Sequence, residues 1–314
     1  MTGARFMLQR PQSSRPVAAP VPRRAPPTFF FGIGSAKSGT SWLYEYLRSH
    51  PDCYLRGHKE LHYFDSLEHG RVLAEQEMLA SQIASGEEKL AKMRGPERAN
   101  AMASLLDKRD FLRVLQVCGR DRNAYYRYMM DGINKQKLVA DITPDYVNLS
   151  APMLTKLVGV ANETRFLFIM RDPVERLWSH IRMNARFEES DFVGASRALL
   201  AKALSGEDVA LAVHSDYAMT LTKMEKAIPA ERRMAMFYED LMTQEGLRKL
   251  CAFLGIKPTK AYFERKVLPG RAAEMTTEDR AAARRFLRPQ YEAVASRFPV
   301  LPKAWQNSMA EGFA

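Results

Sequence analysis

A glycine- and serine-rich turn between an apolar run and an amphipathic segment constrains the fold of this chain most strongly. The run 29–34 is rich in aromatic residues and bounded by glycine, as expected for a buried parallel strand. The turn 34–41 follows, and apolar residues from Trp42 to Leu47 then recur at helical spacing. A strand, a glycine-rich turn and a helix in this order present free backbone N–H groups, which bind phosphate and other anions.

The rest of the chain repeats this alternation of strands and helices. Short apolar runs at 138–141, 165–170 and 233–237 each predict a strand that ends in polar residues. Helical patterns follow at 174–184 and 247–254. The alternation predicts an α/β fold with a central parallel β-sheet flanked by helices. Ligands of such sheets bind at the carboxyl ends of the strands, where these polar residues stand.

Residues 66–135 interrupt the alternation and predict a mostly helical insertion. Apolar residues fall there at roughly heptad spacing, and Gly95-Pro96 divides the stretch into two helices. The apolar stripe is a packing seam, a surface for a partner helix or a wall of a substrate cleft. We predict one domain over 28–314 that carries this insertion. A disordered Pro/Arg-rich tail at 1–27 precedes it.

The charge of the chain is unevenly distributed. Lys and Arg number 47 against 36 Asp and Glu, and the formal net charge of +11 suggests an anionic partner. Five arginines and no acidic residue lie in 1–27, so almost half of the surplus belongs to the tail. The remaining surplus is mild, and we therefore expect no nucleic acid partner.

Cysteine content and hydropathy bear on the compartment. The three cysteines form no C-x-x-C pair, which argues against a zinc site or a disulfide framework and fits a reducing compartment. No apolar run reaches the ~18 residues of a transmembrane helix, and the apolar core of a signal peptide is missing. We expect a cytoplasmic protein that uses no metal.

The sequence of the turn can be compared with the motif of nucleoside triphosphate sites. Gly34 and Gly39 have the separation of the P-loop motif GxxxxGK[ST], but Thr40 rather than a lysine follows the second glycine. Because the lysine stands earlier, at Lys37, a P-loop kinase or NTPase is disfavoured. Asp172 follows a buried strand, as a Mg²⁺-binding carboxylate would, but the proline after it is equally typical of a helix start.

Two stretches of the sequence resemble one enzyme family. SAKSGTSWL at 35–43 resembles the 5′-phosphosulfate loop of sulfotransferases that use 3′-phosphoadenosine 5′-phosphosulfate (PAPS). FIMRDPVERLWSH at 168–180 resembles their 3′-phosphate motif, with Arg171 at a strand end and Ser179 on the following helix. An arginine fork and a hydroxyl suit phosphate oxygens. The resemblance implies a P-loop-like sulfotransferase fold with a helical insertion.

Three further stretches resemble the branch of heparan sulfate sulfotransferases and their bacterial relatives. They are HKELHYFD at 58–65, DITPDY at 141–146 and FYEDL at 237–241. Ile142 stands where the carbohydrate enzymes often have a lysine, so a basic contact to a sulfated polysaccharide is missing. The catalytic histidine of the cytosolic small-molecule branch has no clear counterpart, and Glu60 takes its place.

The resemblance implies roles in catalysis for three side chains. In sulfuryl transfer, as in phosphoryl transfer, positioning and charge stabilisation should dominate. Lys37 would stabilise the charge of the leaving phosphate. Glu60 would be the general base that takes the acceptor proton, unless it is a solvated surface residue. His62 is the rival base, or a structural histidine.

The same resemblance implies a set of donor-binding residues. They are Lys37, Ser38, Gly39, Thr40, Ser41, Trp42, Arg171, Ser179, Tyr217, Lys266 and Arg271. Trp42 would stack on adenine or belong to the core, and Tyr217 would contact adenine by its position in the family. Lys266 and Arg271 flank a loop that would close over the 3′-phosphate or be a plain surface loop.

The acceptor is the least defined part of the prediction. The segments expected to form its pocket, 66–135 and 184–215, resemble the family least. The sequence predicts a PAPS-dependent sulfotransferase that releases PAP and modifies a hydroxyl or amine of a small molecule, lipid or glycan. The alternatives are a P-loop kinase or NTPase, and a non-enzymatic anion-binding module that acts through the basic tail.

Overall fold

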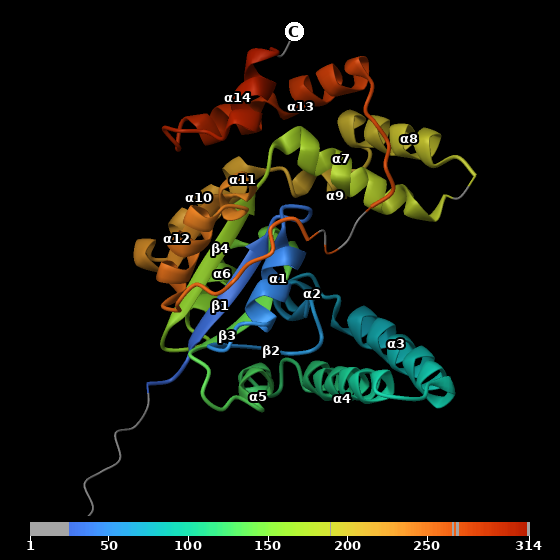
Figure 1. Cartoon of the computed structure of the whole chain (residues 1–314), viewed down its shortest axis with the longest axis vertical. Coiled ribbons are helices and arrows are strands. Elements are labelled where there is room, and N and C mark those ends of the chain that lie inside the picture. Colours follow the sequence, from blue (N-terminus) through green and yellow to red (C-terminus); the bar gives the residue numbers. More distant parts are fainter. Residues whose placement is uncertain (1–24, 189, 266, 268–269, 313–314) are drawn as a thin grey trace, which may run out of the picture.

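The computed structural model describes residues 25–188, 190–265, 267 and 270–312 (Figure 1). Its strands form one parallel sheet in the order β2-β3-β1-β4-β5. The strands are β1 (Thr28–Gly34), β2 (Cys53–Leu55), β3 (Leu138–Ile142), β4 (Thr164–Met170) and β5 (Arg233–Phe237). The predicted parallel α/β architecture is confirmed. The short edge strand β2 was not predicted from the sequence.

Helices surround this sheet, and several begin directly after a strand. The α-helices before β4 are α1 (Thr40–Arg48), α2 (Tyr63–Glu68), α3 (Val72–Lys92), α4 (Glu97–Gln116), α5 (Ala124–Met130) and α6 (Ala151–Val158). The later ones are α7 (Pro173–Asn184), α8 (Phe192–Ser205), α9 (Val209–Val213), α10 (Tyr217–Ala227), α11 (Tyr238–Leu241), α12 (Gln244–Leu254), α13 (Thr277–Ala295) and α14 (Lys303–Ala310). Single 3₁₀ turns are η1 (Pro144–Asn148), η2 (Ala185–Phe187) and η3 (Ala230–Arg232).

The aromatic run of β1 builds a core on both faces of the sheet. Phe29 and Phe31 belong to the larger cluster, with side chains of α5, α6, α7, α10 and α13. Phe30 belongs to the smaller cluster, with α1 and α12. This division follows from the alternation of side chains along a strand. β1 is therefore the central strand, and its carboxyl end opens between the two helical layers.

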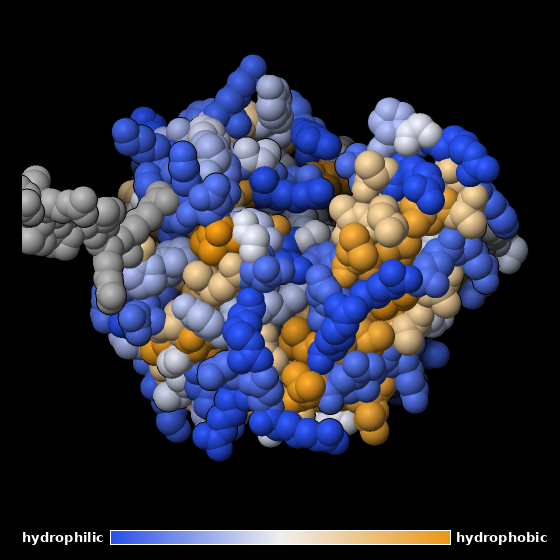
Figure 2. Space-filling model, turned by 90° about the horizontal axis from the view of Figure 1, so that it is seen from below, coloured by the Kyte–Doolittle hydropathy of each residue, from blue (hydrophilic) through white to orange (hydrophobic). Residues whose placement is uncertain are grey.

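The predicted helical insertion is present as α2 to α5, and Figure 1 shows α3 and α4 projecting from the sheet as a pair. Leu79, Ile83 and Leu90 of the apolar stripe are buried, so the stripe is a packing seam. Other apolar residues of the pair are exposed, among them Leu73 and Leu106. Figure 2 views the molecule from the side where this pair lies and shows apolar residues among charged ones.

In the described part of the chain, no helix is long and apolar enough to cross a membrane. Of the predicted tail, residues 1–24 lie outside the described residues.

Candidate active site

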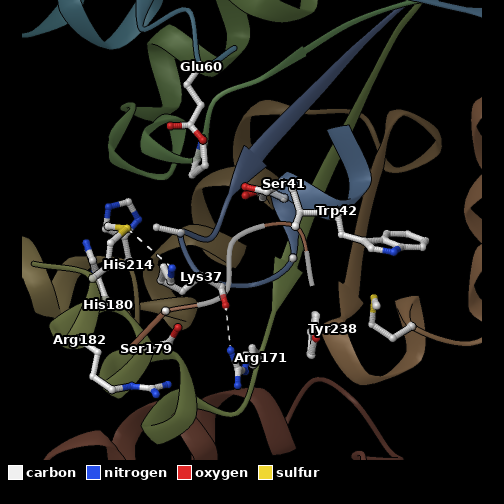
Figure 3. Close-up of a pocket in the computed structure, with 18 of the residues that line it drawn as sticks. Lys37, Ser41, Trp42, Glu60, Arg171, Ser179, His180, Arg182, His214 and Tyr238 are labelled. Atoms are coloured by element: carbon white, nitrogen blue, oxygen red, sulfur yellow. Dashed lines mark hydrogen bonds between the residues drawn. The ribbon is translucent and has the colours of Figure 1, made fainter. Parts of the chain in front are cut away.

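A cleft of about 850 Å³ opens at the carboxyl ends of β1, β3 and β4. Three stretches singled out in the sequence contribute to it: the turn after β1, the segment before α2, and the stretch from the end of β4 through the second half of α7. Figure 3 shows Lys37, Arg171 and Ser179 on one side, Glu60 across from them, and Trp42 and Tyr238 at the far end. The fold therefore joins residues that are far apart in the sequence.

The turn after β1 is a tight loop that exposes backbone at the start of α1. Lys37 has φ 68° and Gly39 has φ 90°, a region that non-glycine residues rarely adopt. A Cβ atom on Gly39 would lie 2.8 Å from Cδ2 of Tyr238, so only glycine fits against this ring. α1 begins at Thr40 without a side-chain cap, which leaves its first N–H groups to the cleft.

Among the basic side chains of the cleft, Lys37, Arg171, Arg182 and Arg186 have no carboxylate partner within the described residues. Burial lowers the pKa of Lys37, and the charges of the three arginines and Lys59 lower it further. Mutual repulsion within such a cluster is relieved by an anion, because arginine and lysine donate strong hydrogen bonds to phosphate and sulfate oxygens. The charge of the cleft therefore favours an anionic ligand.

Arg171 and Ser179 both line this cleft, as their motif predicts. Nη1 of Arg171 donates to the carbonyl of Lys37 at 3.3 Å, and its guanidinium lies 5.2 Å from the ring centroid of Tyr238. Tyr217 differs from the prediction. It is fully buried, and its hydroxyl donates to the Arg171 carbonyl at 2.7 Å. Tyr217 thus supports the end of β4 and is not among the residues that line the cleft.

The sequence left two interpretations open for Trp42, adenine stacking or core packing, and two for Asp172, a Mg²⁺ ligand or a helix start. The contacts of both residues favour one of the two. Trp42 is buried, and the rings of Tyr46 and Phe263 stack on it at centroid distances of 5.6 and 5.5 Å. This favours a packing role over a free face for adenine. The buried carboxylate of Asp172 accepts from two backbone N–H groups of α7 and from the Tyr291 hydroxyl at 2.9 Å. Asp172 therefore caps a helix.

The segment between β2 and α2 presents Glu60 to the cleft. Nζ of Lys59 lies 2.6 Å from Oε1 of Glu60 and donates to Oγ of Ser41 at 2.8 Å. Lys59 therefore connects Glu60 with the loop after β1. Glu60 has φ 58° and His62 has φ 51°, so the backbone here adopts an unfavourable conformation twice within three residues.

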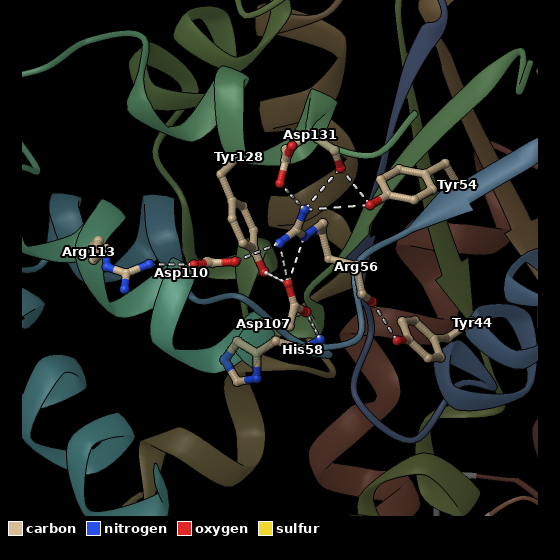
Figure 4. Close-up of polar contacts among 9 residues, drawn as sticks. All are labelled: Tyr44, Tyr54, Arg56, His58, Asp107, Asp110, Arg113, Tyr128 and Asp131. Carbon is tan, nitrogen blue, oxygen red and sulfur yellow. Dashed lines mark hydrogen bonds and ion pairs between the residues drawn. The ribbon is translucent and has the colours of Figure 1, made fainter. Parts of the chain in front are cut away.

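The helical insertion stabilises this segment through a buried ion pair (Figure 4). Asp107 of α4 accepts from Nε of Arg56 at 2.7 Å and from the backbone N–H of His58 at 2.6 Å. The hydroxyl of Tyr128 on α5 donates to the same carboxylate at 3.2 Å. Asp131 adds a backbone carbonyl, 3.0 Å from Nη1 of Arg56. The chain just before Lys59 and Glu60 is thus fixed by residues far along the sequence.

His62, interpreted from the sequence as a rival base or a structural histidine, contacts two carboxylates next to the cleft. Its Nδ1 is 3.0 Å from the buried Asp65 and 3.7 Å from Asp145. Although burial opposes protonation, the hydrogen bond and charge of Asp65 and the charge of Asp145 raise the pKa of His62 to about 9. At neutral pH His62 is therefore protonated, and a protonated imidazole accepts no proton.

Three further cleft residues had no predicted role: Asp145, His180 and His214. Nε2 of His214 lies 3.2 Å from Oδ1 of Asp145. Although burial alone would raise the pKa of Asp145, the hydrogen bond and charge of His214 and the charge of His62 lower it. His180 follows Ser179 directly, so the helical motif itself placed it near the site, whereas nothing in the sequence paired His214 with Asp145.

The remaining predicted residues are less central. Ser38 is buried, and its Oγ has no hydrogen-bond partner in the described part of the chain. The guanidinium of Arg271 lies 4.3 Å from the ring centroid of Phe192 and donates to the Glu188 carbonyl, away from the cleft. Lys266 lies outside the described residues. Among the residues described, no cluster of His, Cys, Asp or Glu has the arrangement of a metal site.

Comparison with known proteins identifies the class. A model of the sulfotransferase family matches residues 27–260, so the chain belongs to that family of enzymes. This excludes the kinase and non-enzymatic alternatives and confirms the resemblance found in the two motifs. No curated protein matches the sequence.

Solved structures of sulfotransferases are similar to this chain. A sulfotransferase from Alicyclobacillus acidocaldarius has 22% identity and a TM-score of 0.58, with 90% of this chain and 100% of that chain covered. The sulfotransferase domain of the Synechococcus PCC 7002 olefin synthase has 16% identity and a TM-score of 0.47, with 90% and 98% covered. The first similarity establishes the sulfotransferase-like fold of the chain.

Proposed function

We propose that this enzyme transfers a sulfuryl group from PAPS to a hydroxyl or amine of an acceptor molecule. The observation that carries the proposal is the group of cleft cations without carboxylate partners among the described residues, placed at the uncapped start of α1. PAPS has phosphates at both ends of a nucleoside, and the residues fit both. Lys37 and the N–H groups of Thr40 and Ser41 would hold the 5′ end, and Arg171 with Ser179 the 3′-phosphate.

Each residue of the cleft has a physical task in this proposal. PAPS supplies an activated sulfuryl group on a phosphate leaving group. Lys37 neutralises the charge that develops on the leaving side, and it is already in place before reaction, so no reorganisation is needed. Arg171 and Ser179 fix the far end of the donor and thereby its orientation.

Glu60 is the proposed general base. It is the predicted base that lines the cleft, whereas His62 carries a proton at neutral pH. Lys59, between Glu60 and Ser41, links the base to the donor loop. The acceptor would enter on the side of Glu60, Asp145 and His214, and its identity as a small molecule, lipid or glycan is open to experiment.

Ligand-dependent thermal unfolding tests the donor. PAP is expected to raise the melting temperature of the full chain, and ATP much less. Lys37→Ala and Arg171→Ala should each weaken PAP binding by about tenfold or more, since each removes a hydrogen bond to a charged group. Stabilisation by ATP alone would contradict the proposal. Incubation with radiolabelled PAPS and fractionated metabolites and lipids would then identify the acceptor by transferred label.

A further inference from the structure

His180 is a buried cleft histidine for which neither motif provides a role. It follows Ser179 on α7, and Figure 3 shows it beside His214 and Lys37. The residue is 9% exposed, and its ring packs edge-on against the ring of His214 at a centroid distance of 5.3 Å. The side chain reaches the cleft, so its protonation state decides what it offers a bound anion.

The protonation state follows from a buried arginine one helical turn earlier. Arg176 is fully buried, with Nε donating to Ser215 Oγ at 2.7 Å and Nη2 to the Leu211 carbonyl at 2.8 Å. Its third contact is Nη1, 3.2 Å from Nδ1 of His180. Burial lowers the pKa of Arg176 only to about 10, so it remains charged at neutral pH. A guanidinium only donates hydrogen bonds, and therefore Nδ1 of His180 must accept.

A histidine whose Nδ1 accepts carries its single proton on Nε2. Burial lowers the pKa of His180 to about 3, the charges of Arg176 and Lys37 and the neighbouring His214 lower it in the same direction, and Asp145 opposes this. The ring is thus neutral, and Nε2–H has no acceptor among the described residues. Because Lys37 and four further cations already crowd the cleft, a neutral donor adds a hydrogen bond to an anion without adding repulsion.

We propose that His180 binds an oxygen at the 5′ end of the sulfuryl donor through Nε2–H, and that Arg176 is the positioning residue that fixes this tautomer. The inference rests on PAPS being the donor. It assigns His180 to the donor side as a neutral hydrogen-bond donor and excludes it as a general base, because its second ring nitrogen is occupied by Arg176. A neutral histidine held in this way polarises an oxygen without giving up its proton.

Nitrogen NMR of the full chain with labelled histidine tests the proposal apart from activity. The chain has six histidines, and the signal of His180 is assigned by its loss in His180→Gln. We expect the neutral Nε2–H tautomer from pH 5 to pH 9 and a change of the Nε2 signal on saturation with PAP. Titration within that range, or a proton on Nδ1, would overturn the inference. In Arg176→Gln both tautomers of His180 should be populated. If this variant does not fold, the tautomer observed in the wild-type chain alone tests the inference.

Binding of PAP separates this inference from the proposed function. His180→Met should raise the dissociation constant about tenfold or more, whereas His180→Gln keeps a donor and should stay within about threefold of wild type. If the wild-type chain binds no PAP, the proposed donor is wrong. If it binds PAP but the Nε2 signal does not move and His180→Met binds as well as wild type, the donor stands and the role of His180 is wrong.

Discussion

Two segments meet in the cleft, and different parts of the chain determine their shapes. The loop 34–41 runs directly from β1 into α1, and its own glycines provide its conformation. The segment 56–62 runs from β2 to α2 and is fixed by Asp107 and Tyr128, which come from the helical insertion. The comparison teaches that the loop proposed to bind the donor is encoded locally, whereas the segment that carries the proposed base depends on distant residues.

The largest effect on turnover is expected from replacing Glu60, the proposed base. The affinity for PAP should not change. Glu60→Gln keeps the size of the side chain and removes its ability to take a proton. We expect turnover to fall by about 10²–10⁴-fold, the usual contribution of a general base. PAP affinity, measured by calorimetry, should stay within about twofold of wild type.

Glu264→Gln is the matched control, because Glu264 also lines the cleft but is exposed and follows Phe263, whose ring stacks on Trp42. Its turnover should stay near that of wild type. Near-wild-type turnover in Glu60→Gln would remove Glu60 as the base and with it the functional contrast between the two segments.

The second largest effect is expected from removing Asp107, which holds the segment 56–62, and it should appear mainly as a loss of stability. Asp107→Ala leaves the buried Arg56 without its main partner, and breaking a buried pair costs about 3–5 kcal/mol of unfolding free energy. In the protein that remains folded, turnover should fall more than PAP affinity, because the shape of 56–62 is lost while the loop 34–41 is not. Chemical denaturation and calorimetry measure the two effects.

Asp110→Ala gives the control for the same arginine. Its carboxylate lies 3.8 Å from Nη2 of Arg56 and is 43% exposed, so its removal should cost at most about 1 kcal/mol. Equal losses in the two variants would show that the buried contact has no special part in fixing the segment.

The same contrast explains what was predictable from the sequence. The strand, the glycines of the turn and Lys37 follow one another in the chain, so local pattern sufficed, and Arg171 with Ser179 form a second local pattern. The buried position of Tyr217 was not predictable, because sequence position does not tell whether a side chain lines a cleft or packs beneath it. The contacts Arg56–Asp107 and Asp145–His214 join separate elements, and no spacing rule in one sequence pairs them.

A methyl group on the donor loop should have a moderate effect. Gly39→Ala combines an unfavourable positive φ with a contact to Tyr238, and we expect a loss of about 1–3 kcal/mol together with weaker PAP binding. Gly119→Ala has a similar φ of 80° with nothing within 4 Å of the new Cβ, so it carries the backbone strain alone. If both variants bind PAP like wild type, the close packing of the loop on Tyr238 does not shape the donor site.

The smallest expected effect is a pH dependence of the unfolding free energy that comes from His62 in the segment 56–62. Because the pKa of His62 is raised to about 9 in the folded chain, above the ~6.5 of an unperturbed histidine, its contribution is fully present below pH 6.5 and is lost as pH rises through 9. We expect the unfolding free energy to fall across this window by on the order of 1 kcal/mol more in wild type than in His62→Gln. Denaturation at pH 6, 7, 8 and 9 measures the difference. Parallel pH profiles would mean that the Asp65–His62 contact does not stabilise the start of α2, and that the insertion alone fixes the segment carrying Glu60.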